Sequence, residues 1–170
     1  MAEIQSSIRG LELERAVFDV EISETALSST GKDAVRFLFS ASGKNPVEVS
    51  KCASGGELSR IMLCLKAMMA KYANMPSMIF DEIDTGVSGS VADKMGSMIC
   101  SMGNYMQVFA ITHLPQVAAK GEAHYLVSKE TSSGDNVRTS IEKISGKERI
   151  MEVARMLITK IGRASCRERV

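Results

Sequence analysis

Three short motifs carry residue types that suit the hydrolysis of a nucleotide. The sequence Ser-Gly-Gly-Glu at residues 54–57 precedes an apolar helical pattern, while Asp81-Glu82 and Thr112-His113 each end a short apolar run. A helix N-terminus binds phosphate, a carboxylate holds magnesium, and a second carboxylate or a histidine orients the attacking water. Together the motifs predict one half of a nucleotide-hydrolysing site.

The other half of such a site is missing from the sequence. A phosphate-binding loop has the pattern Gly-x-x-x-x-Gly-Lys-Ser/Thr, in which the hydroxyl reaches magnesium. The Gly-Lys pairs at residues 31–32, 43–44 and 146–147 are each followed by another residue type. We therefore expect no ATP turnover from this chain alone.

The first motif also has a purely local explanation. Ser54 at the N-cap and Glu57 three residues later form a capping box, which stabilises a helix by about 1 kcal/mol. Gly55 and Gly56 each weaken the first turn by about 1 kcal/mol relative to alanine, and a cap does not need them. Close approach of an anion to the first-turn amides, in contrast, requires glycines at these positions. The two explanations are compatible, because the same cap presents the amides.

The acidic residues after the first apolar run have a structural alternative as well. Asp81 can hold magnesium through water, and Glu82 can orient or deprotonate the attacking water. The alternative is a solvated strand end. Asp84, with the threonine and glycine that follow it, can simply form a turn.

The two histidines of the chain differ in the residues that surround them. His113 can hydrogen-bond the γ-phosphate or the attacking water, or it can serve only the fold. His124 has no comparable pattern around it, and we interpret it as structural. The order and spacing of the three motifs favour the functional interpretation of His113.

Hydrophobic periodicity predicts the elements that position these residues. The expected elements are a helix at 4–11, antiparallel strands at 17–22 and 35–39, a helix after Ser54, strands at 78–80 and 108–111, helices at 88–102 and 114–120, a hairpin over 125–144 with its turn at 132–135, and a final helix capped by Ser145 and Glu148. The strand–helix–strand–helix order favours parallel pairing in an α/β sheet. The side chains expected to face the core include Phe18, Val20 and Ile22, then Leu58, Ile61, Met62, Leu65, Met68 and Met69, and on the last helix Ile150, Val153, Ala154 and Leu157.

Composition argues against a basic nucleic-acid-binding surface and against a membrane protein. At 170 residues the chain fits about one domain, and its net charge of +1 gives no electrostatic footprint for nucleic acid. Cys64 and Cys100 lie in apolar helical patterns, so we expect buried, reduced thiols. The absence of a signal peptide or long apolar run favours a cytoplasmic location and no membrane partner.

The last ten residues differ from the rest of the chain. Residues 161–170 have no apolar periodicity, and they can be encoded by a sequence that resembles a common sequencing adapter. We hypothesise that they form a non-native tail, and that the natural chain continues differently after about residue 160.

These motifs resemble the carboxy-terminal lobe of an ABC-type ATPase head of the SMC class, most closely a bacterial DNA-repair member. The resemblance covers most of residues 11–158 and is carried by residues 37–41, 53–62, 79–89 and 111–118. It implies an α/β fold, the C-terminal lobe of a P-loop ATPase head, with a parallel sheet, flanking helices and β-hairpins. Residues 13–160 would form this lobe, and residues 1–12 would be the remnant of a coiled-coil helix.

The resemblance also implies a role for each site residue. Ser54, Gly55, Gly56 and Glu57 would be the signature motif, which touches ATP bound to the opposite subunit. Asp84 would lie in the D-loop at the dimer seam.

The remaining roles concern hydrolysis itself. Asp81 would be the Walker B acid that holds Mg²⁺ through water, Glu82 the general base, and His113 the switch histidine.

The partners implied are an N-terminal lobe carrying the Walker A loop, a second ATPase head in a homodimer, and DNA bound through the full-length protein. The chain would then be a fragment of an ATP hydrolase that acts at the nucleoid in double-strand-break repair and recombination. The alternatives are the head of another SMC-class ATPase and a non-catalytic interaction module. A sheet without its partner lobe should also expose apolar surface and limit solubility.

Overall fold

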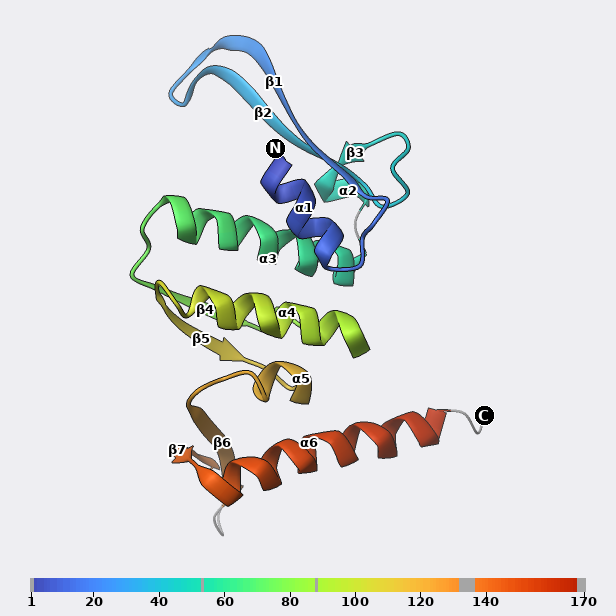
Figure 1. Ribbon diagram of the computed structural model, residues 1–170. Helices are drawn as coiled ribbons and strands as arrows, with labels where there is room; N and C mark the ends of the chain where they lie inside the picture. The colour runs from blue at the N-terminus through green and yellow to red at the C-terminus, as the bar shows by residue number, and fades with distance from the viewer. Residues whose placement is uncertain (1, 53, 88, 132–136, 168–170) are drawn as a thin grey trace. The chain divides into compact units, whose positions relative to one another are not determined.

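The computed structural model describes residues 2–52, 54–87, 89–131 and 137–167 (Figure 1). The chain divides into a first unit, Met1–Ile111, and a second unit, Thr112–Val170. The first unit contains α1 (Ala2–Gly10), β1 (Val17–Ser28), β2 (Gly31–Ser40), β3 (Val47–Glu48), α2 (Val49–Cys52), α3 (Gly55–Tyr72), β4 (Ser77–Asp81), α4 (Gly89–Met102) and β5 (Gln107–Ile111). The second contains α5 (Pro115–Ala118), β6 (His124–Thr131), β7 (Val137–Ile144) and α6 (Gly146–Arg167).

Three helices build the core of the first unit. Helix α3 contacts α1 and also α4 (Figure 1). The predicted first helix is confirmed, with Ile4 and Ile8 buried in it and Leu11 buried just beyond its end. Full burial of such aliphatic side chains stabilises the fold by roughly 1.5–3 kcal/mol each.

The predicted inward face of α3 is partly wrong. Ile61 is buried, but Leu58, Met62 and Met69 are 39%, 40% and 58% exposed. The other buried positions are Leu63, Cys64 and Ala70, which lie on different sides of the helix from the predicted stripe. Because α3 packs against two helices, it buries more than one side and leaves the stripe open.

Strands β4 and β5 pair in parallel, as predicted. Met78 and Phe80 point to a buried face, whereas Ile79 on the opposite face is 65% exposed. Its cross-strand neighbour Phe109 is 45% exposed. The register pairs Asp81 with Ile111, so the carboxyl ends of the two strands are aligned.

The antiparallel pairing of β1 and β2 is also confirmed, from Val17 opposite Ser40 to Ser28 opposite Gly31. The hairpin projects beyond the helices of the first unit (Figure 1). Phe18 is buried at its base, but Ile22, which the sequence predicted to face the core, is 66% exposed. The described helices of the first unit lie near the base of the hairpin and leave this part of it exposed (Figure 1).

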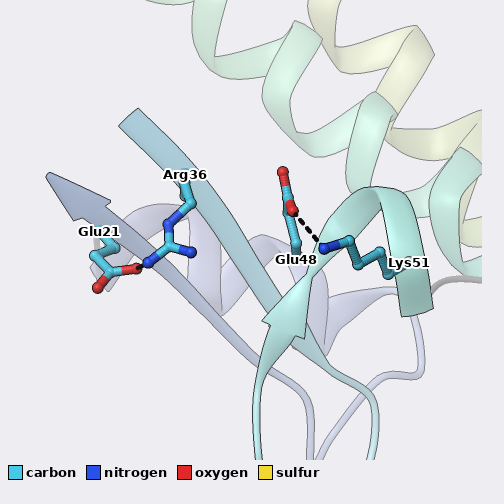
Figure 2. Close-up of polar contacts among 4 residues, drawn as sticks. All are labelled: Glu21, Arg36, Glu48 and Lys51. Carbon is cyan, nitrogen blue, oxygen red and sulfur yellow. Dashed lines mark hydrogen bonds and ion pairs between the residues drawn. The ribbon is translucent and has the colours of Figure 1, made fainter. Parts of the chain in front are cut away.

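Charged pairs lie along this hairpin and the segment that follows it. Arg36 of β2 donates a hydrogen bond to Glu21 of β1, and Lys51 of α2 lies 3.4 Å from Glu48 of β3 (Figure 2). Exposed ion pairs of this kind contribute roughly 0–1 kcal/mol. The hairpin therefore depends on its buried base rather than on these charges.

The base of the hairpin is fixed by one side chain of α1. The Oε1 atom of Gln5 accepts a hydrogen bond of 3.0 Å from the Phe18 amide. The Nε2 atom of Gln5 donates to the carbonyl oxygen of Ala16. The amide side chain of Gln5 thus satisfies one backbone carbonyl group and one backbone amide.

In the second unit, Arg149 of α6 holds the turn that follows α5. Its guanidinium donates hydrogen bonds to the carbonyl oxygens of Ala119, Gly121 and Glu122. The predicted hairpin is confirmed as antiparallel β6 and β7, although its predicted turn lies outside the described residues. Burial, and then the charge of Arg149, lower the pKa of His124, which favours its neutral form.

The predicted inward face of the last helix is wrong at three of its four positions. Ile150 is 69% exposed, Leu157 is 44% exposed, and Ala154 is exposed as well. Helix α6 contacts α5, and a four-residue helix is too short to cover one side of a 22-residue helix. Helix α6 continues to Arg167, and residues 168–170 of the predicted tail lie outside the described residues.

None of the helices in the described part of the chain combines the length and apolarity that a membrane span requires.

Cys64 and Cys100 differ in their burial. Cys64 of α3 is fully buried, and burial raises the pKa of its thiol to about 12. Cys100 of α4 is exposed, so its predicted burial is wrong. The buried side of α4 is formed instead by positions that include Met95, Ile99 and Met102.

We expect the thiol of Cys100 to react with iodoacetamide at pH 8 in the folded protein, and Cys64 to react only after unfolding, because the nucleophile is the thiolate. Peptide mapping by mass spectrometry measures each site separately. Equal labelling of both cysteines in native conditions would contradict the packing of α3.

Candidate nucleotide-binding site

The N-terminus of α3 forms the capping box that the sequence predicts. The Oγ atom of Ser54 accepts a hydrogen bond of 3.4 Å from the Glu57 amide. The Glu57 carboxylate accepts one of 2.9 Å from the Ser54 amide. This reciprocal pair leaves the amides of Gly55 and Gly56 outside the capping box, at the positive end of the helix dipole. Ala53, which completes the motif, lies outside the described residues.

The two glycines of this turn have different surroundings. A Cβ atom on Gly55 would meet no heavy atom within 4 Å, so an approaching ligand has room there. A Cβ atom on Gly56 would lie 2.7 Å from the carbonyl oxygen of Gly86. Gly56 is therefore required by close packing against the loop after β4, a contact that the sequence did not reveal.

That loop is a compact turn. The amide and hydroxyl of Thr85 donate hydrogen bonds of 3.2 and 2.9 Å to the carbonyl oxygen of Glu82. The Val87 amide donates to the carbonyl oxygen of Asp84 at 3.2 Å. Gly86, at φ +74°, adopts a backbone conformation that favours glycine. Asp84 therefore lies in a turn, which is the structural interpretation that the sequence allowed for it.

The three acidic residues of this region are placed differently. Asp81 and Glu82 are exposed where β4 ends, whereas the side chain of Asp84 is fully buried. Glu82 has φ +48°, in the left-handed region that costs an ordinary residue about 1–2 kcal/mol. Strained backbone of this kind concentrates at functional sites.

Side chains from α3 complete the attachment of the loop, and sequence analysis did not single them out. The Ser59 hydroxyl lies 2.9 Å from the carbonyl oxygen of Gly55 and 3.5 Å from that of Thr85. Arg60 donates a hydrogen bond of 3.1 Å to the carbonyl oxygen of Gly56. Their positions four residues after each glycine were the available signal, since helical neighbours are spaced in that way.

His113 belongs to the second unit, near its start. Its side chain is exposed, and it lies between β5 and α5. The Thr112 hydroxyl accepts a hydrogen bond of 3.0 Å from the Leu114 amide, which helps to start α5. The structure thus brings together residues 54–57 and the 82–87 loop, and it describes His113 with the other unit.

The residues present suit a magnesium nucleotide. Asp81 and Glu82 offer exposed carboxylate oxygens, the donor type that Mg²⁺ prefers. Among the described residues, no three His, Cys, Asp or Glu side chains gather closely enough to hold a metal. A site with one or two carboxylates fits Mg²⁺, because this ion keeps waters and phosphate oxygens as its other ligands.

The chain has the α/β fold found in SMC head domains, which confirms the predicted fold class. The Smc head domain of Pyrococcus yayanosii matches 91% of this chain and 28% of its own, with a TM-score of 0.71 and 16% identity. A chain from a structural study of ATP-driven dimerization of SMC ATPases matches 92% of this chain and 91% of its own, with a TM-score of 0.60 and 16% identity.

The sequence resembles that of the DNA repair protein RecN. The chain is 40% identical over 157 residues to RecN of Vibrio cholerae and 38% identical over 172 residues to RecN of Bacillus subtilis, in each case over 91% of this chain. It spans 28% and 30% of the length of these relatives. No family model matches the chain.

We expect Gly56→Ala to destabilise the fold by about 1–3 kcal/mol, because the new methyl group would overlap the Gly86 carbonyl oxygen. Gly55→Ala, one residue earlier in the same turn, is the matched control and should stabilise the helix by up to about 1 kcal/mol. Urea unfolding of both variants measures the difference. Equal stabilities would mean that the loop does not pack on this turn.

A second prediction concerns the backbone of Glu82. Glu82→Asn should raise the free energy of unfolding by up to about 1 kcal/mol, because asparagine adopts the left-handed region more readily. Glu82→Gln keeps the unfavourable conformation and should leave stability near that of the parent. If thermal unfolding shows no advantage of asparagine over glutamine, the positive φ angle is not a property of the native chain.

Proposed function

We propose that this chain is the C-terminal lobe of the ATPase head of a longer, SMC-like protein that repairs double-strand breaks in DNA. The contact between Gly56 and Gly86 carries the proposal, because it fixes a phosphate-binding helix start beside the loop that begins with Glu82. The resemblance to RecN along 91% of the chain supports the same conclusion.

In this proposal the candidate site residues divide the chemistry between them. The amides of Gly55 and Gly56 bind phosphate oxygens of an ATP molecule held by the opposite head. Asp81 would hold Mg²⁺ through water, and the bound ion would supply neutralisation of the charge on the phosphates. Glu82 accepts the proton of the attacking water while the γ-phosphoryl group is transferred. His113 hydrogen-bonds the γ-phosphate or the attacking water.

A second lobe must supply the phosphate-binding loop that this sequence lacks. Apolar side chains that are exposed on β4, β5 and α3 support such a partner, among them Ile79, Phe109, Met62 and Met69. A two-stranded parallel sheet is rarely left uncovered, because parallel sheets are normally buried on both faces. In the proposal, the N-terminal lobe of the longer protein covers this surface, and two complete heads enclose two ATP molecules.

The arm of the protein and its DNA partner lie beyond the head. We propose that residues 1–12, which include α1, are the end of a coiled coil, and that DNA binds through the full-length protein. The net charge of +1 gives this lobe no basic footprint of its own. The proposed location is the cytoplasm, at the nucleoid.

The test is a chimaera in which this chain replaces the matching segment of Vibrio cholerae RecN. We expect the chimaera to hydrolyse ATP, and Glu82→Gln to reduce turnover about 10²- to 10⁴-fold, because the general base is removed. Nucleotide binding should persist in that variant. ATP hydrolysis is measured by phosphate release at saturating ATP.

Glu21→Gln is the control, since it removes an exposed carboxylate of the hairpin. It should leave turnover unchanged. A folded chimaera without ATPase activity, or one whose activity survives Glu82→Gln, would refute the proposed function.

A further inference from the structure

Arg60 makes two hydrogen bonds that join separate parts of the first unit. It lies in the second turn of α3 and is half-buried. Its Nε atom donates to the carbonyl oxygen of Gly56 at 3.1 Å, and its Nη1 atom donates to the carbonyl oxygen of Leu11, also at 3.1 Å. One planar guanidinium therefore bridges the helix start of the candidate site and the end of α1.

The end of α1 is held from a second direction as well. Glu12 follows the helix at φ +63°, and its carboxylate lies 3.0 Å from the Nζ atom of Lys94 in α4. A hydrogen bond with Ser90, and then the interaction with Lys94, lower the pKa of Glu12. The end of α1 is thus a junction of three helices, and Arg60 is its link to α3.

From Gly56 the connection continues to the acidic residue after β4. Gly56 packs against Gly86, the Ser59 hydroxyl reaches the carbonyl oxygen of Thr85, and Thr85 bonds to Glu82. Every step is a direct contact within the first unit.

We propose that Arg60 is a positioning residue that couples the position of α1 to the Ser54–Glu57 turn and, through Gly86 and Thr85, to Glu82. A shift of α1 moves the Leu11 carbonyl group, and the guanidinium transmits that shift to the Gly56 peptide. The consequence for ATP hydrolysis rests on the proposed function, whereas the mechanical link does not.

The proposed coupling requires an arginine at position 60 and is not met by a lysine. The guanidinium has donors in a rigid planar fork, so Nε and Nη1 can serve two acceptors at once. Lysine keeps the charge near the end of α1 but presents a single ammonium group on a flexible stem. A role limited to stabilising the α1 terminus by charge is met by either residue. A coupling role requires the fork.

The experiment uses the RecN chimaera and measures hydrogen exchange at the amides of residues 55–57 and 85. Ile8→Ala loosens α1, because Ile8 is fully buried. In the parent chimaera we expect Ile8→Ala to speed exchange at these amides by at least about threefold. In the Arg60→Lys background, Ile8→Ala should add no further change there, although it still speeds exchange within α1.

Arg9→Lys is the matched control, an exposed arginine in the last turn of α1. It should leave the effect of Ile8→Ala intact. Arg60→Lys should also raise the ATP concentration for half-maximal hydrolysis by about three- to tenfold, as expected for the loss of a charged hydrogen bond. Additive effects of Ile8→Ala and Arg60→Lys on exchange, or full retention of coupling with lysine, would overturn the inference.

The two proposals fail in different ways. An inactive but folded chimaera refutes the proposed function, while the exchange measurement still decides whether Arg60 couples α1 to the turn. An active chimaera with additive exchange effects refutes only the coupling. If Arg60→Lys lowers the melting temperature with no change in either readout, Arg60 is structural, and the inference is wrong.

Discussion

The close approach of two backbones, at Gly56 and Gly86, is the constraint on which the candidate site depends. A side chain at Gly56 would place its first carbon 2.7 Å from the Gly86 carbonyl oxygen, well inside van der Waals contact. Two glycines at a helix start each cost about 1 kcal/mol relative to alanine. That cost is offset by a fixed relation between a helix N-terminus and the loop that carries Glu82.

Irregular backbone conformations also occur in the loop after β4. Glu82 and Gly86 both have positive φ angles, and the carbonyl oxygen of Glu82 accepts two hydrogen bonds from Thr85. The side chain of Asp84 is buried inside this turn, although an acidic residue is among the least often buried types. This turn contains one acidic residue with a strained backbone and one whose side chain is buried, so it does not serve only to connect a strand to a helix. Its shape holds Glu82 at the strand end.

The first unit also has exposed apolar side chains on two of its surfaces. Side chains on the open face of β4 and β5, and along the exposed stripe of α3, are apolar although they face solvent. Exposed apolar surface of this kind marks an interaction site. The short lengths of β4 and β5, five residues each, also leave few strand contacts to stabilise the sheet. These exposed apolar side chains suit the partner lobe that is proposed above.

Local order was predictable from the sequence, because its causes lie within a few residues. The capping box at Ser54 and the alternation that gives β1 and β2 follow from neighbouring side chains and a short turn. The order of strand, helix and strand favoured the parallel pairing of β4 with β5. The candidate site residues were also identified from local motifs. Asp81, Glu82 and the Ser54–Glu57 turn lie where helix and strand boundaries place them.

Only the tertiary structure decided which surfaces meet. The bond from Arg60 to Leu11 spans 49 residues, and that from Ser59 to Thr85 spans 26. The exposure of Met69 and Cys100 likewise depends on which helices pack beside them. Periodicity identifies an apolar side of a helix, but it does not show how many neighbours that helix has. Local sequence therefore determined the elements and their chemistry, and long-range packing determined the contacts that hold them in register.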